Sequence, residues 1–231
     1  MPFNKLFKHK YAFAFGISLL FHVSAINGLL FTDYKDFFID NTPLNLIISM
    51  ILVFFTHQNI NKSFWLFFIA CSAAGVIYEI IGINTGLLFG DYEYSDVMGY
   101  KFLGVPVLLG NLWFTTMYCV GSLTFQSYNW LKSTYNFKIS KKVEIHLLAI
   151  FGALAAVLLD LFLEPVAIKL NFWQWFPYGK IPIYNYVCWF FGSLILQYLF
   201  VKSNFNKENK FAVYLYGIQA VFFVAIILFY K

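Results

Sequence analysis

Residues 158–175 have the sequence LLDLFLEPVAIKLNFWQW, and the fold can be argued outward from this stretch. It closes a long apolar run of the kind that forms a membrane-spanning helix, yet it contains two acids, Asp160 and Glu164. Residues four apart share one face of a helix, so the two Cβ atoms are expected to lie roughly 5–6 Å apart. Pro165 disfavours helical geometry in the residue before it, so we expect Glu164 at a helix end or kink. Ionisable groups in lipid are costly, and a pair of them points to a function.

The composition is that of a polytopic helical membrane protein. The 231 residues are 61% hydrophobic and 12% charged, whereas an average globular domain is about 25% charged. Apolar runs of about twenty residues recur along the chain, the length that a helix needs to cross a bilayer. We therefore predict an all-α fold, with a single transmembrane domain over residues 1–231. The expected location is the cell membrane, as a multi-pass protein of the bacterial inner membrane.

The apolar runs predict about seven transmembrane helices, and lysine positions predict their orientation. The expected limits are 11–31, 43–56, 64–82, 103–125, 145–163, 181–201 and 211–230. All sixteen basic residues are lysine, and eleven of them fall at the N-terminus and in the second, fourth and sixth loops. The positive-inside rule then places the N-terminus in the cytoplasm, and Glu79, Asp160 and Glu164 near the outer membrane face. The net charge of +5 is thus explained by topology and does not indicate a nucleic-acid partner.

Two segments, 64–127 and 145–201, resemble each other and suggest a parallel internal repeat. Each has an acid near a helix end, then two aromatic residues two positions apart, then a proline seven residues before a tryptophan. The aromatic residues concerned are Tyr92, Tyr94 and Trp113 in the first segment, and Trp173, Trp175 and Trp189 in the second. Chance similarity in an aromatic-rich chain is the alternative. In either case we expect the two segments to pack together at the outer face.

These residues also have ordinary structural explanations. Acids near helix ends can extend to the interface or cap the helix, aromatic pairs can form an interfacial belt, and Asn185 can hydrogen bond between helices. Asp91 lies in a loop, where a carboxylate is normally solvated. His22, on an apolar helix, is more often a core residue than a ligand. Glu79, Asp160 and Glu164, however, are all expected near the same membrane face. This shared location makes a purely structural explanation of the three acids weaker.

The sequence offers no recognisable metal or cofactor site, and none is expected. The four histidines form no HxxH or HExxH pattern. The three cysteines each fall inside an apolar run, without metal-binding or redox spacing. Asp-rich DDxxD runs, which bind metal ions in prenyltransferases, are missing as well. Any chemistry is therefore expected to use carboxyl groups.

Several motifs together resemble one protein family. They are EIIGINTGLLFGDYEY at 79–94, KFLGVP at 101–106, DLFLEPVA at 160–167, and WQW at 173–175 followed by P-x-x-N before WF. Over about residues 64–192 this pattern resembles the CruF-type carotenoid biosynthesis proteins, which are integral-membrane carotenoid hydratases and include the bisanhydrobacterioruberin hydratases. The resemblance implies an enzyme of the hydro-lyase type that adds water to the terminal 1,2 double bond of an acyclic carotenoid end group. The implied partners are the acyclic carotenoid, water as co-substrate, the lipid bilayer and other carotenoid enzymes.

The acids and aromatic residues suit this reaction. A carboxyl group in apolar surroundings keeps its proton more readily than one in water, and neighbouring carboxyl groups lose their protons in separate steps. One acid can protonate the alkene and another can deprotonate the attacking water, while aromatic faces stabilise the cation by about 1–2 kcal/mol each. We expect Asp160 to be the general acid, assisted by Glu164 or Glu79, with Asp91 as a further candidate. The expected substrate-binding residues are Tyr92, Tyr94, Trp113, Trp173, Trp175, Asn185 and Trp189.

Two other functions fit the same sequence. An integral-membrane carotenoid cyclase of the lycopene type also protonates an end group, but an internal alkene then quenches the cation. A small-solute membrane transporter is the alternative from a different class. A polar midplane site closed to lipid would favour the transporter, and a wide apolar groove open to lipid would favour the carotenoid enzyme.

Overall fold

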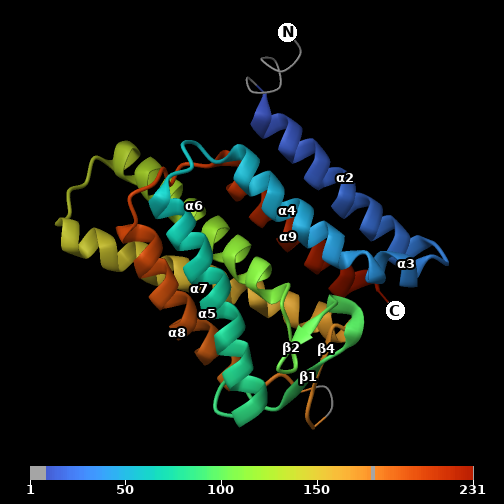
Figure 1. Ribbon diagram of the computed structural model, residues 1–231. Helices are drawn as coiled ribbons and strands as arrows, with labels where there is room; N and C mark the ends of the chain where they lie inside the picture. The colour runs from blue at the N-terminus through green and yellow to red at the C-terminus, as the bar shows by residue number, and fades with distance from the viewer. Residues whose placement is uncertain (1–8, 178–179, 231) are drawn as a thin grey trace.

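The computed structural model describes residues 9–177 and 180–230 and consists mainly of long helices (Figure 1). The helices are α2 (Lys10–Phe31), α3 (Lys35–Asp40), α4 (Thr42–Thr56), α5 (Lys62–Thr85), α6 (Leu109–Tyr135), α7 (Lys141–Lys169), α8 (Ile183–Lys202) and α9 (Lys210–Phe229). The short elements are β1 (Tyr92–Tyr94), the 3-10 helix η1 (Asp96–Met98), β2 (Lys101–Phe102), β3 (Val105–Pro106) and β4 (Trp173–Trp175). Lys5, Lys8 and Lys231, which enter the lysine count, lie outside the described residues.

The predicted all-α membrane fold is confirmed. Within the described residues, six helical stretches are long and apolar enough to cross a membrane. They are α2, the consecutive α3 and α4, α5, α7, α8 and α9. The remaining long helix, α6, is less apolar and lies in the middle of the bundle, where it contacts α4, α5, α7, α8 and α9. Residues 113–122 of α6 are all buried. This part of α6 is therefore surrounded by other helices, whereas the outer helices each have a face toward lipid.

The fourth predicted helix begins later than the sequence indicated. It was expected over 103–125, but α6 starts only at Leu109 and extends well past the expected end. The reason is a small hairpin, in which β2 pairs with β3 around a turn at Leu103 and Gly104. Both turn residues have positive φ angles, of 50° and 84°, which a helix does not allow. Apolar character alone could not distinguish this hairpin from the start of a span.

The expectation that a helix ends at Glu164 is wrong, while a kink at this position stays a prediction. Helix α7 continues through Pro165 for another turn. Val166 and Ala167 are completely buried in the core, and the Leu170 amide donates to the Val166 carbonyl oxygen at 2.9 Å. Packing after the proline thus holds the helix together, and Glu164 lies inside α7.

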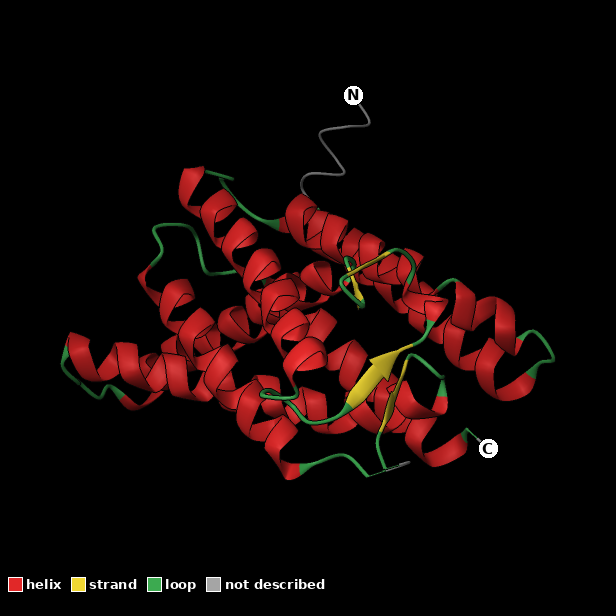
Figure 2. Ribbon diagram, turned by 60° about the horizontal axis from the view of Figure 1, so that its bottom comes forward, coloured by secondary structure: helices red, strands yellow, loops and turns green. Residues whose placement is uncertain are grey.

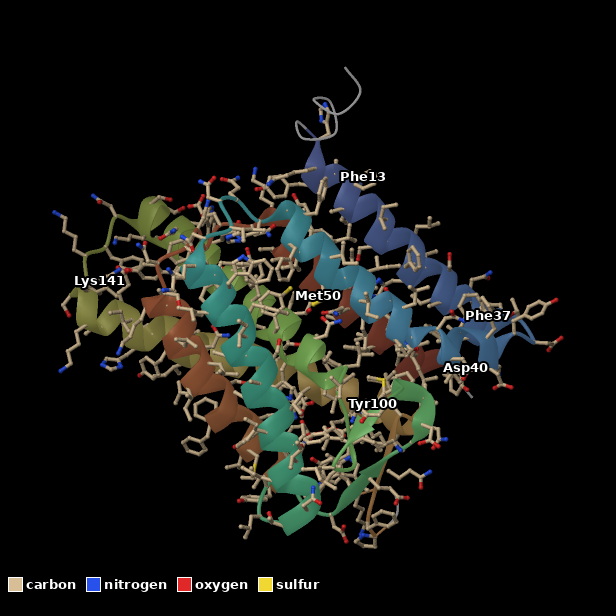
Figure 3. The ribbon with its side chains drawn as sticks, viewed as in Figure 1. Phe13, Phe37, Asp40, Met50, Tyr100 and Lys141 are labelled. Carbon is tan, nitrogen blue, oxygen red and sulfur yellow. The ribbon has the colours of Figure 1, made fainter. Side chains whose placement is uncertain are left out.

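The strands gather at one end of the bundle. In Figure 1, β1, β2 and β4 lie at the lower right with the C-terminus, and the connection from α6 to α7 lies at the far left. Figure 3 places Lys141 at that far end, and Asp40 and Tyr100 at the end with the strands. The structure therefore places Lys141, at the start of α7, and Asp40, at the end of α3, at opposite ends of the bundle. Which end faces the cytoplasm stays a prediction.

A two-stranded antiparallel ribbon joins the two similar segments of the chain. Strand β1 pairs with β4 (Figure 2). In this pairing Tyr92 lies opposite Trp175, and Tyr94 lies opposite Trp173. Side chains alternate between the two faces of a strand, so these four aromatic residues share one face of the ribbon. The pairing brings the two segments together as expected, while their origin by duplication stays a prediction.

Close helix packing beneath the ribbon can be tested at Gly75. A Cβ atom there would lie 2.3 Å from Cγ of Trp113, whose ring stacks on Trp189 with centroids 4.4 Å apart. We expect Gly75→Ala to lower the free energy of unfolding by about 1–3 kcal/mol, because the indole must move. Gly16, also helical, has nothing within 4 Å of such a Cβ, so Gly16→Ala is expected to be neutral or stabilising by up to about 1 kcal/mol. Unfolding of the detergent-solubilised protein measures both, and equal values for the two variants would contradict this packing.

Candidate active site

Glu164 accepts three hydrogen bonds in a buried position. Its Oε2 atom accepts from Nε1 of Trp173 at 3.0 Å and from Nε1 of Trp175 at 2.8 Å. Its Oε1 atom accepts from Nδ2 of Asn185 at 3.2 Å. The two tryptophans come from alternate positions of β4, which is why a WQW strand can direct two indole N–H groups at one carboxyl group.

Glu79 has a matching set of donors. Its Oε2 atom accepts from the hydroxyl groups of Tyr92 at 2.6 Å and Tyr94 at 2.9 Å, and its Oε1 atom accepts from Nε1 of Trp113 at 3.2 Å. Burial raises the pKa of both tyrosines, and the neighbouring charge of Glu79 raises it further. Both hydroxyl groups therefore stay protonated and act as donors. Each of the four aromatic residues on this face of the ribbon thus donates a hydrogen bond to one of the two glutamates.

Asp160 lies one helical turn before Glu164 and shares a partner with it. Nδ2 of Asn185 donates to Oδ2 of Asp160 at 3.1 Å as well as to Glu164. An amide NH2 group has two hydrogens, so it can serve both carboxyl groups at once. The other oxygen of Asp160, Oδ1, is buried and has no hydrogen-bond partner among the described residues. This oxygen is free to carry a proton.

A small cavity lies between the two glutamates, and we call it the acidic cavity. Its volume is about 20 Å³, enough for roughly one water molecule. It is lined by Glu79, Phe89, Tyr92, Tyr94, Leu109, Leu112, Trp113, Glu164, Trp173, Trp175, Asn185 and Trp189. All of the residues expected from the sequence to bind substrate are in this lining, together with two of the four expected acids. Phe89, Leu109 and Leu112 were missed, because apolar residues in an apolar chain give no signal.

Two expected acids are not in the lining. Asp160 is buried behind Asn185, one turn away from the cavity. Asp91 is exposed, and the structure does not bring it to the other acids. The alternation of β1 explains this, since Tyr92 and Tyr94 turn inward and their neighbours Asp91 and Glu93 are exposed.

A larger cavity, the apolar cavity, lies next to the acidic cavity. Its volume is about 350 Å³, within the range of pockets that hold small molecules. Leu112 and Trp173 line both cavities. The other lining residues are Leu20, Phe21, His22, Ser24, Ala25, Leu29, Phe37, Phe38, Asn41, Thr42, Leu44, Asn45, Leu46, Met98, Leu163, Leu170, Phe172, Gln219, Phe222 and Phe223. None of these residues carries a formal charge at neutral pH.

The apolar cavity could not be predicted from local sequence patterns. Its wall combines α2, α3, α4 and α9 with the end of α7, and each contributes ordinary apolar residues. The available signal was a set of polar residues within or next to apolar runs, namely His22, Asn45 and Gln219. His22 is buried, as expected of a core histidine, and it also borders the cavity.

The fold and site define a multi-pass helical membrane protein with buried carboxyl groups beside an apolar cavity. Residues 41–231 match the family model described as carotenoid biosynthesis protein, so the chain belongs to the carotenoid biosynthesis protein family. No curated protein and no solved structure matches the chain. The family match extends beyond residues 64–192, where the motifs lie, and takes in α4 and α9, which line the apolar cavity. The protein therefore has a role in carotenoid biosynthesis.

The donors to Glu164 can be tested without removing an aromatic ring. Trp175→Phe deletes one N–H donor to this buried carboxyl group and keeps most of the ring packing. We expect the free energy of unfolding to fall by about 1–3 kcal/mol, because the acceptor is left under-satisfied. Trp130→Phe is the matched control, since Trp130 is 62% exposed and a surface change of this kind costs about 0.5 kcal/mol or less. If equilibrium unfolding of the two variants were indistinguishable, the Trp175 hydrogen bond would not stabilise the site.

Proposed function

We propose that the protein is a carotenoid hydratase of the hydro-lyase type. It adds water across the terminal 1,2 double bond of an acyclic carotenoid end group and forms a tertiary hydroxyl. The observation that carries the proposal is the pairing of the two cavities. Glu79 and Glu164 line the acidic cavity, which shares Leu112 and Trp173 with the larger apolar one.

The apolar cavity supports a substrate that arrives from the bilayer. Leu20, Phe37 and Leu44 line this cavity and are also exposed at the surface of the bundle, by 59%, 61% and 48%. Their side chains put part of the cavity wall at the face that meets lipid. A neutral polyene partitions into lipid, so a cavity with this wall suits it better than it suits a polar solute.

The proposed reaction begins with a proton from a carboxyl group. Glu164 transfers a proton to C2 of the alkene, the π electrons form the new C–H bond, and C1 becomes a tertiary cation. The oxygen of a water molecule in the acidic cavity bonds to C1, and Glu79 takes the proton that this water loses. Return of that proton from Glu79 to Glu164 restores the enzyme, so the net change is the addition of one water. No oxidant or reductant is required.

The aromatic residues of the ribbon support the cation. The rings of Tyr92 and Trp175 have centroids 4.9 Å apart, and those of Tyr94 and Trp173 are 5.7 Å apart, all beside the acidic cavity. Ring faces attract a nearby cation by about 1–2 kcal/mol each. The small volume of the cavity limits the water that can reach the cation and favours a single addition.

The assignment of the acid shifts from Asp160 toward Glu164. Asp160 was expected to be the general acid, but only Glu164 of the pair reaches the cavity. Two buried carboxyl groups that share the Asn185 amide resist carrying two negative charges, so together they hold a proton. Asp160 then acts as a positioning residue and proton reserve for Glu164.

Substitution of the acids tests the proposal. In a lycopene-producing bacterium, the wild-type protein is expected to convert the carotenoid to a product heavier by one water per reacted end. Glu164→Gln and Glu79→Gln are expected to lower product formation at least about 100-fold, the usual scale of general acid–base catalysis. Glu93→Gln, which changes an exposed glutamate of β1, should leave it unchanged. Chromatography with mass spectrometry measures all four, with immunoblotting to match protein levels. Undiminished product in both cavity variants would contradict the assignment.

The source of the oxygen separates the hydratase from its alternatives. Membranes containing the protein, incubated with lycopene in ¹⁸O-labelled water, are expected to yield a hydroxylated carotenoid that carries the label. An unlabelled hydroxyl group would mean that oxygen comes from O2 and that the protein is an oxygenase. A product with the mass of the substrate and a ring at its end would mean a cyclase.

A further inference from the structure

A pocket with charged walls lies at the end of the bundle away from the strands, and we call it the charged pocket. Its volume is about 280 Å³, and its charged lining residues are Lys141, Glu144, Lys207 and Glu208. Lys141 begins α7, whereas Lys207 and Glu208 lie in the connection between α8 and α9. These three helices are all long and apolar enough to cross a membrane, and Figure 3 shows Lys141 at their end opposite the strands. The charged pocket therefore lies where spanning helices leave the bilayer.

The charge of Glu144 is already compensated within the protein. Its Oε1 atom accepts a hydrogen bond from Nζ of Lys141 at 2.5 Å. Its Oε2 atom accepts from the hydroxyl group of Tyr128 at 3.0 Å and from Nζ of Lys132 at 3.4 Å. With two lysines and a tyrosine as donors, this carboxylate needs no partner from outside.

Lys207 and Glu208 differ from Glu144, because neither forms an ion pair within the described residues. Nζ of Lys207 donates to the Ser203 carbonyl oxygen at 2.6 Å, and an ammonium group has two further N–H donors. Burial lowers the pKa of Lys207, and the nearby positive charge of Lys141 lowers it further. Glu208 is exposed. The pocket thus presents one positive and one negative side chain, each without a counter-charge.

This pair of charges selects for a ligand that carries both signs. A simple anion would be attracted to Lys207 but repelled by Glu208, and the reverse holds for a simple cation. A molecule with a phosphate and a primary ammonium group joined by a short link can pair with both side chains. The rest of the pocket is apolar, with Phe125, Leu148 and Val201 in its wall. Hydrocarbon attached to the phosphate can pack against these residues.

We propose that the charged pocket binds the headgroup of phosphatidylethanolamine from the surrounding bilayer. The phosphate accepts hydrogen bonds from Nζ of Lys207, the ammonium group donates to the carboxylate of Glu208, and the glycerol end of the lipid packs on the apolar wall. Basic pockets between membrane helices bind lipid headgroups, and the adjacent acid adds a preference for an ammonium group. This lipid site is separate from the acidic cavity and does not depend on the proposed function.

Lipid titrations of the purified full-length protein test the proposal. Dioleoyl phosphatidylethanolamine and dioleoyl phosphatidylglycerol have the same acyl chains and phosphate, but only the first has an ammonium group. Native mass spectrometry of the detergent-solubilised protein measures the binding of each lipid. The wild type is expected to bind phosphatidylethanolamine about fivefold more tightly, the scale of one partly exposed ion pair.

Three variants separate the two charges. Glu208→Gln should lose the preference, because it weakens binding of phosphatidylethanolamine and removes the repulsion of phosphatidylglycerol. Lys207→Gln should weaken binding of both lipids, since both have the phosphate. Lys142→Gln is the matched control, because Lys142 is exposed and does not line the pocket, and it should bind both lipids as the wild type does.

The wild type alone can overturn the proposal, whatever the variants do to folding. Equal binding of the two lipids would mean that the ammonium group is not recognised. Tighter binding of phosphatidylglycerol would mean a site for acidic lipids instead. A preference for phosphatidylethanolamine that persists in Glu208→Gln would place its recognition elsewhere on the protein. None of these results bears on the hydration reaction, because binding is measured without turnover.

Discussion

Carboxyl groups buried away from water need hydrogen-bond donors, and in this protein the β1–β4 ribbon provides most of them. Trp173 and Trp175 donate to Glu164, and Tyr92 and Tyr94 donate to Glu79. Each pair comes from alternate positions of a short strand, and the strands pair although they are distant in sequence. The ribbon thus ties the α5–α6 half of the bundle to the α7–α8 half. Without it, two acids in the interior would be left with one donor side chain each, Trp113 or Asn185.

The same network that stabilises the acids also leaves room for chemistry. Glu79 and Glu164 are surrounded by donors, but a space for about one water molecule remains between them. Asp160 keeps one oxygen unpaired within the described residues. In the proposed reaction, the adjoining apolar cavity brings a lipid-soluble molecule to the same place. Membership in the carotenoid biosynthesis family and this pair of cavities together lead to acid-initiated addition of water as the proposed reaction.

Much of the fold follows from the sequence, because lipid imposes a simple length and polarity on each span. The sequence also predicts that the two aromatic-rich segments pack together, but not the strands that align them, although spacing by two is the period of a strand. Other features depend on contacts that no local pattern encodes. Helix α7 passes Pro165 because of buried packing beyond it, and Asp91 is exposed because it directly precedes Tyr92, whose side chain turns inward. The apolar cavity is formed by helices whose apolar residues differ little from those that face lipid.

The central claim is that a carboxyl group of this protein protonates a carbon–carbon double bond and that water captures the cation. Incubation of the purified protein with lycopene in D2O, followed by NMR spectroscopy of the product, tests it most directly. Carboxyl protons exchange with solvent, so the account predicts one deuterium bonded to C2 for each new hydroxyl group at C1. A product that carries the hydroxyl group at C1 but no carbon-bound deuterium at C2 would contradict it.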